Sequence, residues 1–530
     1  MSPARRWLLP ALPLCFLAVV LVAPVLRLLV EGLSAGASEL RWAEVWTDDY
    51  LRWRVLWSLA QAAITCALAL LLGLPCAWVL ARYEFPGRVL ALRLLMLPFV
   101  VPTLVAAMGV LALWGPRGVF GAPLAEAGIE GVGTPWLLLY GNLFFNLCLV
   151  VRAGVDALGQ VGAQRLAAAR TLGATPWRAF WRVEWPVIAP WLASALCLVF
   201  LYCFSGFGLA LILGGERFST AEVEIYTLVA HELELRRAGV LAIWMMLLTG
   251  TVALAYAWLE RRLAAPARVT PVPRQRPVRG RQRLAVGAAL AVLLVVCVAP
   301  LAAIVWRAAV ALIAGSGGAV LQDDDTLQAL GNTLRFSLIA LALATALGLS
   351  HAFAAQRGVG WRAMAFLPFV VSPVSVAFGL LLLYPGWSAS LAMLLAAYGL
   401  LAWPFVAKSV SAGLDSLPPN YAQAAATLGA SPWRVFRRVT LPLIAPALRR
   451  GMAFAAATAL GEFAVTLFLS RPEWTTLTTL IHQHLGRPGS AKLDAAFVLA
   501  ALLMALALLA FVLIEGPADH GSSGDNARHA

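Results

Sequence analysis

Twelve stretches of this chain are apolar for about twenty residues, the length at which an α-helix crosses the hydrocarbon of a bilayer. Hydrophobic residues make up 61% of the chain and charged residues 12%, whereas soluble proteins carry about 25% charged residues. The sequence therefore predicts an all-α, polytopic membrane protein with about twelve transmembrane helices in a lipid bilayer. The spans are expected at 8–30, 55–81, 92–114, 136–153, 187–213, 239–259, 284–313, 330–355, 362–384, 388–410, 447–469 and 493–514.

The net charge of +14 is divided among short clusters between the apolar runs, a pattern that indicates membrane loops and argues against a nucleic-acid partner. The even-numbered loops are basic and the odd-numbered loops are acidic or mixed. Because cytoplasmic loops carry the excess of positive charge, both termini are expected in the cytoplasm. The basic loops contain Arg82–Arg93, Arg165–Arg182, Arg261–Arg283, Arg357–Arg362 and Arg434–Arg450; the others contain Glu39–Asp49, Glu216–Glu234 and Asp323–Asp325.

A 24-residue segment occurs twice, at a constant offset of 256 residues and with 16 identical positions. The copies read AAARTLGATPWRAFWRVEWPVIAP from Ala167 and QAAATLGASPWRVFRRVTLPLIAP from Gln423. The offset persists to Phe207 and Phe463 in the next span, so two homologous six-helix units are fused in one chain. The predicted divisions are a first repeat (1–259), a basic linker (260–283), a second repeat (284–516) and a cytoplasmic tail (517–530). Each repeat is expected to contain a helix–turn–helix, here called an elbow, near 157–186 in the first and near 413–442 in the second.

The linker contains four prolines and eight arginines between 261 and 283. Proline and arginine together resist compact folding, so this segment is expected to act as a tether. A role for its arginines at lipid headgroups is an alternative.

Each copy of the repeated segment predicts a helix–turn–helix elbow at the cytoplasmic face. Three small residues end a short helix, and a glycine then supplies the positive φ of a helix stop. A Thr or Ser caps a second short helix whose first position is proline, and a later proline ends it. In order, these residues are Ala167, Ala168, Ala169, Gly173, Thr175, Pro176 and Pro186 in the first elbow, and Ala424, Ala425, Ala426, Gly429, Ser431, Pro432 and Pro442 in the second.

These elbows resemble the EAA motif of the permeases of binding-protein-dependent ABC importers: EAA, three residues, Gly, nine residues, then Ile-x-Leu-Pro. The resemblance implies two type I importer permease repeats, with each elbow forming the coupling helix that sits in a groove of the ATPase. One departure matters, because the family's glutamate is replaced by Ala167 in the first copy and by Gln423 in the second. Any salt bridge from that glutamate to the ATPase is then lost or replaced.

Several first-half segments resemble most the permeases for thiamine and thiamine pyrophosphate. They are WAEVWTDDYLRWRVLWSLAQA from Trp42, RYEFPGR from Arg82, FFNL from Phe144, FWRVEWP from Phe180, CFSGFGLALILGG from Cys203 and AEVEIY from Ala221. This likeness implies a thiamine importer that receives substrate from a periplasmic binding protein. A ferric-iron permease is the alternative within the class, because fused permeases of that kind share the arrangement.

The chain contains no Gly-Lys pair, so it cannot form a GxxxxGK[ST] phosphate loop. We therefore expect no enzyme activity, no catalytic residue, no cofactor and no metal in this chain. ATP and Mg²⁺ would be used by a partner ATPase, expected as a homodimer with one protomer per elbow. His482 and His484 form an HxH in a predicted external loop, which we interpret as ordinary loop residues rather than metal ligands. A secondary transporter and a membrane scaffold are the rivals from other classes.

Glu462 is the one carboxylate deep in a predicted span. A charge there costs at least about 2.5–3.5 kcal/mol on insertion scales, so it should face a cavity or a partner. It either guides a cationic substrate such as thiamine or forms a structural pair with an arginine or another helix. Asn146 and Ser205 are weaker candidates for the substrate pathway, because both residue types also serve helix–helix packing.

Overall fold

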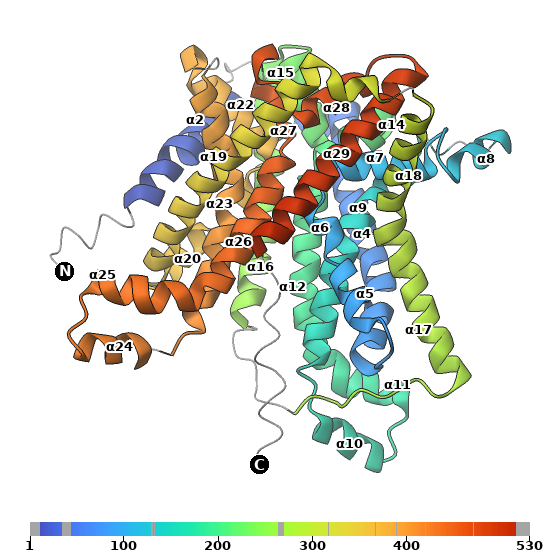
Figure 1. Ribbon diagram of the computed structural model, residues 1–530, viewed down its shortest axis with the longest axis vertical. Helices are drawn as coiled ribbons and strands as arrows, with labels where there is room; N and C mark the ends of the chain where they lie inside the picture. Colours follow the sequence, from blue (N-terminus) through green and yellow to red (C-terminus); the bar gives the residue numbers. More distant parts are fainter. Residues whose placement is uncertain are drawn as a thin grey trace.

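The computed structural model describes residues 11–33, 44–128, 131, 133–262, 270–315, 317–365, 367–387, 390–418, 420–469 and 471–515. The predicted tail at 517–530 and the first ten residues lie outside these ranges. Within them the chain is helical apart from loops and two isolated β-bridges. Two bundles stand side by side, touching near one end and separating toward the other (Figure 1).

The first half contains η1 (Ala18–Val22), α2 (Ala23–Leu33), α3 (Glu44–Thr47), α4 (Asp49–Arg82), α5 (Arg88–Leu94), α6 (Leu97–Val100), α7 (Thr103–Trp114), α8 (Gly121–Glu126), α9 (Pro135–Leu158), α10 (Ala163–Thr171), α11 (Pro176–Ala179), η2 (Phe180–Glu184), α12 (Trp185–Phe204), α13 (Gly208–Leu213), α14 (Gly215–Phe218), α15 (Ala221–Ala230) and α16 (Leu235–Arg262).

The second half contains α17 (Gly280–Leu293), η3 (Leu294–Val298), α18 (Ala299–Ile313), η4 (Ala319–Gln322), α19 (Asp324–Ala355), α20 (Val359–Met364), α21 (Leu367–Val370), α22 (Pro373–Leu383), η5 (Pro385–Trp387), α23 (Leu391–Asp415), α24 (Asn420–Thr427), α25 (Pro432–Val435), η6 (Phe436–Thr440), α26 (Leu441–Leu460), α27 (Ala464–Leu469), η7 (Pro472–Trp474), α28 (Leu477–Leu485) and α29 (Ser490–Glu515).

The first helix of each half packs against the other half. α2 contacts α22, and α18 contacts α7. Glycine permits both close approaches, because a β-carbon at Gly109 would lie 2.8 Å from the Pro300 carbonyl oxygen and one at Gly379 would lie 2.8 Å from that of Pro24. The two repeats are therefore interlocked, which holds them together at the end where the bundles touch.

Nine described helices are long and apolar enough to cross a membrane, or ten if the bent pair 88–100 and 103–114 counts as one span. Three of the twelve predicted spans are not single long apolar helices in the described chain. Span 92–114 consists of the end of α5, then α6 and α7, with the 111° bend between the last two. Span 362–384 consists of the short helices α20, α21 and α22. Span 447–469 consists of α26, which carries Arg449 and Arg450, followed after a break by α27.

The elbows lie at the end where the bundles separate, which we call the elbow end (Figure 1). Gly173 and Gly429 have φ of 79° and 78°, as the sequence predicts. The hydroxyls of Thr175 and Ser431 accept hydrogen bonds at 3.4 Å from the backbone N–H groups of Arg178 and Arg434, so both predicted N-caps are present. Local chemistry therefore fixes the shape of both turns.

The prediction that Pro186 and Pro442 end the second short helix of each elbow is wrong. Residues 176–204 form one continuous helical segment, as α11, η2 and α12. The π-helical turn η2 comes immediately before α12, in which Pro186 occupies an early position. The turn η6, α26 and Pro442 are arranged in the same way in the second elbow. A widened turn and an initial position both tolerate the missing N–H, so the elbow continues directly into the membrane span.

Part of the linker is an ordered strap, residues 270–279, which runs along the first half at the elbow end. Its Gln275 N–H donates to the Arg82 carbonyl at 2.9 Å, and Glu84 N–H donates to the Gln275 carbonyl at 3.0 Å. Ala163 N–H, at the start of α10, donates to the Thr270 carbonyl at 3.0 Å. The expected loose tether is therefore wrong for the strap, because proline favours the extended backbone that these bonds need. Residues 263–269 lie outside the described ranges.

Candidate functional site: a cavity between the halves, and the elbows

A cavity of about 320 Å³ lies between the two halves. Both repeats contribute to it through the places where their helices are interrupted. The first-half walls are Phe99–Thr103, Asn142, Phe145, Asn146, Tyr202, Ser205–Leu209 and Tyr256. The second-half walls are Pro368, Phe369, Val371, Pro373, Leu401, Pro404, Phe405 and Gly461–Ala464.

Two of the interruptions come from a second, shorter internal repeat. The sequence LPFVVP, from Leu97, recurs as LPFVVSP from Leu367. In the first half the chain bends by 111° at this point, between residues 100 and 103. The corresponding break in the second half lies at Val371–Ser372, between α21 and α22. Prolines that cannot continue a helix therefore place Phe99 and Phe369 on the cavity wall. Sequence reasoning missed this repeat, although it could be read from the sequence.

Glu462, Asn146 and Ser205, the three predicted pathway residues, all line the cavity. Glu462 lies in the break between α26 and α27, is 9% exposed, and accepts a hydrogen bond from Val465 N–H at 2.9 Å through Oε1. No arginine of the described chain forms an ion pair with it. Glu462 thus caps α27 with one oxygen while it faces the cavity.

The amide and hydroxyl candidates are held mainly by their own half. Asn146 Nδ2 donates to the Asn142 carbonyl at 2.8 Å and approaches the Cys203 sulfur at 3.3 Å. Ser205 Oγ donates to the Leu201 carbonyl at 2.7 Å, one helical turn back. The hydroxyl is therefore already satisfied within α12, which makes Glu462 the stronger candidate for substrate contact.

Aromatic rings dominate the apolar part of the cavity, and sequence reasoning did not place them there. Phe207 and Phe463, at corresponding positions of the repeats, meet across the halves with ring centroids 6.0 Å apart. Phe99 and Phe369 contact Tyr202 edge-on at 6.1 and 6.4 Å. A carboxylate beside several aromatic faces suits an organic cation, through charge and cation–π attraction.

Glu222 is a second buried carboxylate between the halves. It is 1% exposed and accepts a hydrogen bond at 2.6 Å from Ser372 Oγ, at the α21–α22 break of the other half. The sequence places Glu222 in the acidic connection between two spans, and the structure shows that this connection contains the helix α15, packed against α22. His482 and His484, expected in a loop, likewise lie on α28.

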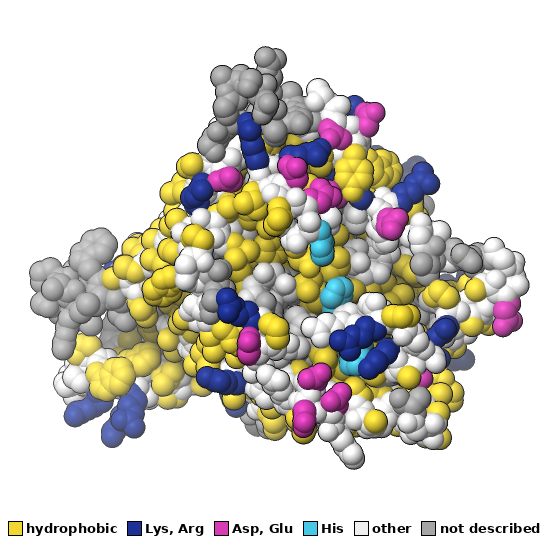
Figure 2. Space-filling model, turned by 90° about the horizontal axis from the view of Figure 1, so that it is seen from above, with side chains coloured by type: hydrophobic (Ala, Val, Ile, Leu, Met, Phe, Trp, Pro, Cys, Tyr) yellow, Lys and Arg dark blue, Asp and Glu magenta, His cyan; other side chains and the backbone are white. Residues whose placement is uncertain are grey.

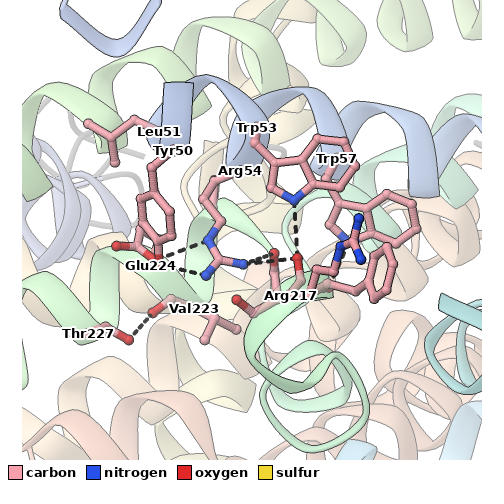
Figure 3. Close-up of polar contacts among 12 residues, drawn as sticks. Tyr50, Leu51, Trp53, Arg54, Trp57, Arg217, Val223, Glu224 and Thr227 are labelled. Carbon is pink, nitrogen blue, oxygen red and sulfur yellow. Dashed lines mark hydrogen bonds and ion pairs between the residues drawn. The ribbon is translucent and has the colours of Figure 1, made fainter. Parts of the chain in front are cut away.

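A buried charged clamp fastens the segment around α14 and α15 to α4 (Figure 3). Arg54 Nε lies 3.3 Å from Glu224 Oε2, and both side chains are almost fully buried. Tyr50 donates to the same Glu224 oxygen at 2.8 Å, and Trp57 donates to the Phe218 carbonyl at 2.6 Å. Burial raises the pKa of Glu224, while the Tyr50 hydrogen bond and the Arg54 charge oppose that rise.

The second half fastens the corresponding segment with neutral groups. Asn332 Nδ2 donates to the carbonyls of Glu473 and Thr475, each at 2.9 Å. One contact is common to both halves. The Ser58 hydroxyl accepts a hydrogen bond from the first backbone N–H of α15, and the Thr333 hydroxyl accepts one from the first backbone N–H of α28, each at 2.9 Å. The two clamps therefore hold equivalent helices at the end opposite the elbows, with different chemistry.

The elbows present large apolar side chains to their surroundings. Leu172 and Leu428 are each 88% exposed, and Trp177 and Trp433 are 70% and 68% exposed. These residues occupy corresponding positions in the two copies. Both elbows therefore expose the same pattern of a leucine and a tryptophan.

The family model described as "Binding-protein-dependent transport system inner membrane component" matches residues 69–265 and 345–515. The chain belongs to this family. It is therefore a multi-pass inner-membrane component of a binding-protein-dependent ABC importer, whose partners are an ATPase and a substrate-binding protein. Members of this family are the transmembrane components and are not themselves ATPases. The two matched segments correspond to the two repeats.

Two relatives match nearly the whole chain, and a third matches part of it. The thiamine transport system permease protein ThiP of Escherichia coli (strain K12) is 26% identical over 526 residues, 96% of each chain. ThiP of Brucella abortus (strain 2308) is 27% identical over 534 residues, 97% of this chain and 95% of that protein. The sulfate transport system permease protein CysW of Synechocystis sp. is 31% identical over 211 residues, 40% of this chain and 76% of that protein.

Proposed function

We propose that this permease imports thiamine and its phosphates. The likeness to thiamine permeases over 96% of both chains carries the proposal. The cavity agrees with it, because Glu462 and the surrounding aromatic rings offer a carboxylate and π-faces to a cationic, aromatic substrate. Glu462, Asn146 and Ser205 would line the pathway, with Glu462 making the main polar contact.

Two surfaces would serve the partners. Each elbow, with Ala167–Ala169 and Gly173–Pro186 in the first and Gln423–Ala425 and Gly429–Pro442 in the second, would dock one protomer of an ATPase homodimer. The periplasmic binding protein would dock at the opposite end, where Figure 2 shows basic, acidic and hydrophobic side chains interspersed over the face. Closure of the ATPase dimer would bring the separated elbow ends together and open the opposite end.

Reconstituted transport tests the substrate. The permease is expected to take up labelled thiamine in proteoliposomes only when the ATPase, ATP and the binding protein are all present. Ferric iron, the alternative substrate, is the matched comparison under the same conditions. ATP-dependent uptake of ferric iron without uptake of thiamine would replace the thiamine proposal with the iron one.

The orientation follows from charge, with both termini and the linker in the cytoplasm. In a variant freed of its natural cysteines, Arg276→Cys on the strap should resist an impermeant maleimide in intact cells. Gln322→Cys, exposed beyond α18 at the opposite end, should react under the same conditions. Both sites should react after the cells are opened. Labelling of the Arg276 position from outside would reverse the orientation.

A further inference from the structure

A second cavity, of about 470 Å³, lies at the elbow end of the first half. It is lined by the end of α4, the start of α5, the end of α9 and the strap, and it opens to the surface. Its charged lining is Arg82, Glu84, Arg88 and Arg274, and Gly159 lies on its wall. The cavity is separate from the central one between the halves.

Two of its three arginines already have carboxylate partners. Arg82 forms a buried ion pair with Glu184 at 2.7 Å. Arg274 pairs with Glu84 at 3.3 Å. Arg88 differs from both, because no carboxylate of the described ranges forms an ion pair with it. Its side chain is only 5% exposed, and its Nε donates to the Leu80 carbonyl at 2.7 Å. A buried guanidinium without a directly paired carboxylate is costly. The three arginines also exceed their two carboxylates, Glu84 and Glu184, by one positive charge.

The second repeat pairs a comparable but half-exposed guanidinium with a carboxylate. There Arg362 Nε donates to the Ala355 carbonyl, as Arg88 does to Leu80. Arg362 is also paired at 2.8 Å with Asp415, the last residue of α23. At the offset of 256 that relates α9 to α23, the position of Asp415 is occupied by Gly159. The first repeat therefore has a cavity where the second repeat has a carboxylate.

We propose that this cavity binds an exogenous phosphate group, whose oxygens take the place of the missing carboxylate at Arg88. The planar guanidinium presents paired N–H donors that match phosphate oxygens, and the nearby Arg274 can supply more. The strap, which also binds the start of α10 through Thr270 and Ala163, forms one wall of the site. Either a soluble phosphate compound or a phospholipid headgroup would supply the same chemistry.

Titrations on the full-length, delipidated permease in detergent test the proposal. The probes are inorganic pyrophosphate at constant ionic strength, and phosphatidylglycerol with phosphatidylcholine as its uncharged comparison. We expect one of the two anions to raise the melting temperature in a saturable way. Arg88→Gln should weaken the apparent affinity at least about tenfold, equivalent to about 1.4 kcal/mol. Arg93→Gln, an exposed arginine on the same helix, should leave it unchanged.

Gly159→Asp is the decisive variant, because it restores the carboxylate of the second repeat. Gly159 has a right-handed φ of −65°, which any residue can adopt. The variant should be more stable without added anion and should lose the response to it. A response to pyrophosphate alone identifies a soluble ligand, and a response to phosphatidylglycerol alone identifies a lipid site. Absence of stabilisation by both, or an undiminished response in Gly159→Asp, would overturn the proposal.

Discussion

Valine at Gly173 or Gly429 is expected to abolish most substrate uptake. Both glycines have φ near +79°, and a β-carbon added to either would have no atom within 4 Å, so a side chain has room but the backbone does not suit it. A β-branched residue there costs roughly 1–2 kcal/mol in the left-handed region. The turn would relax and move α11, with exposed Trp177, away from α10.

Uptake and association with the ATPase should fall together in these variants, each by about tenfold or more, the equivalent of about 1.4 kcal/mol. Co-purification of the ATPase and transport in proteoliposomes measure the two effects. Gly315→Val is the matched control, because Gly315 has φ of 73° and equally open surroundings but lies far from the elbows. Normal uptake by both elbow variants at normal expression would show that these turns do not couple the permease to ATP hydrolysis.

The elbows could be predicted in detail because their shape depends on neighbouring residues. A glycine, a capping hydroxyl and an initial proline determine each turn within a few positions, and the structure contains all three. The one local error was at Pro186 and Pro442, which do not end the elbow helix because a π-helical turn carries it on into the span. Other errors arose where distant parts of the chain meet. The strap is ordered by bonds to Arg82, Glu84 and Ala163, more than a hundred residues away, and composition alone gives no sign of those partners.

The central cavity was predictable only in part. Glu462 stood out because a carboxylate in an apolar span needs an explanation. Glu222 did not, because in sequence it lies among other acidic residues, and only the packing of α15 against α22 buries it. The broken helices were missed since hydropathy averages over a span and ignores a proline that bends it. The spacing of LPFVVP and LPFVVSP would have revealed both breaks.

Glu462→Gln is expected to reduce thiamine uptake by about tenfold or more, equivalent to about 1.4 kcal/mol, while the permease still assembles with its ATPase. Glutamine keeps the shape and an oxygen that can accept the Val465 N–H, so the start of α27 should remain capped. What the substitution removes is the negative charge on the cavity wall. A cationic substrate would then lose its attraction to that charge, whereas the uptake of a neutral substrate would be unaffected.

The measurement is uptake per assembled complex, with melting temperature recorded in parallel. Ser205→Ala serves as the matched control, because Ser205 lines the same cavity but its hydroxyl is bound to the Leu201 carbonyl; its uptake should stay near the wild-type value. If Glu462 acts as a structural partner instead, the glutamine variant should melt earlier, and its uptake loss should follow the amount of complex. Unchanged uptake per complex would remove Glu462 from the pathway and leave recognition to the aromatic rings around Phe207 and Phe463.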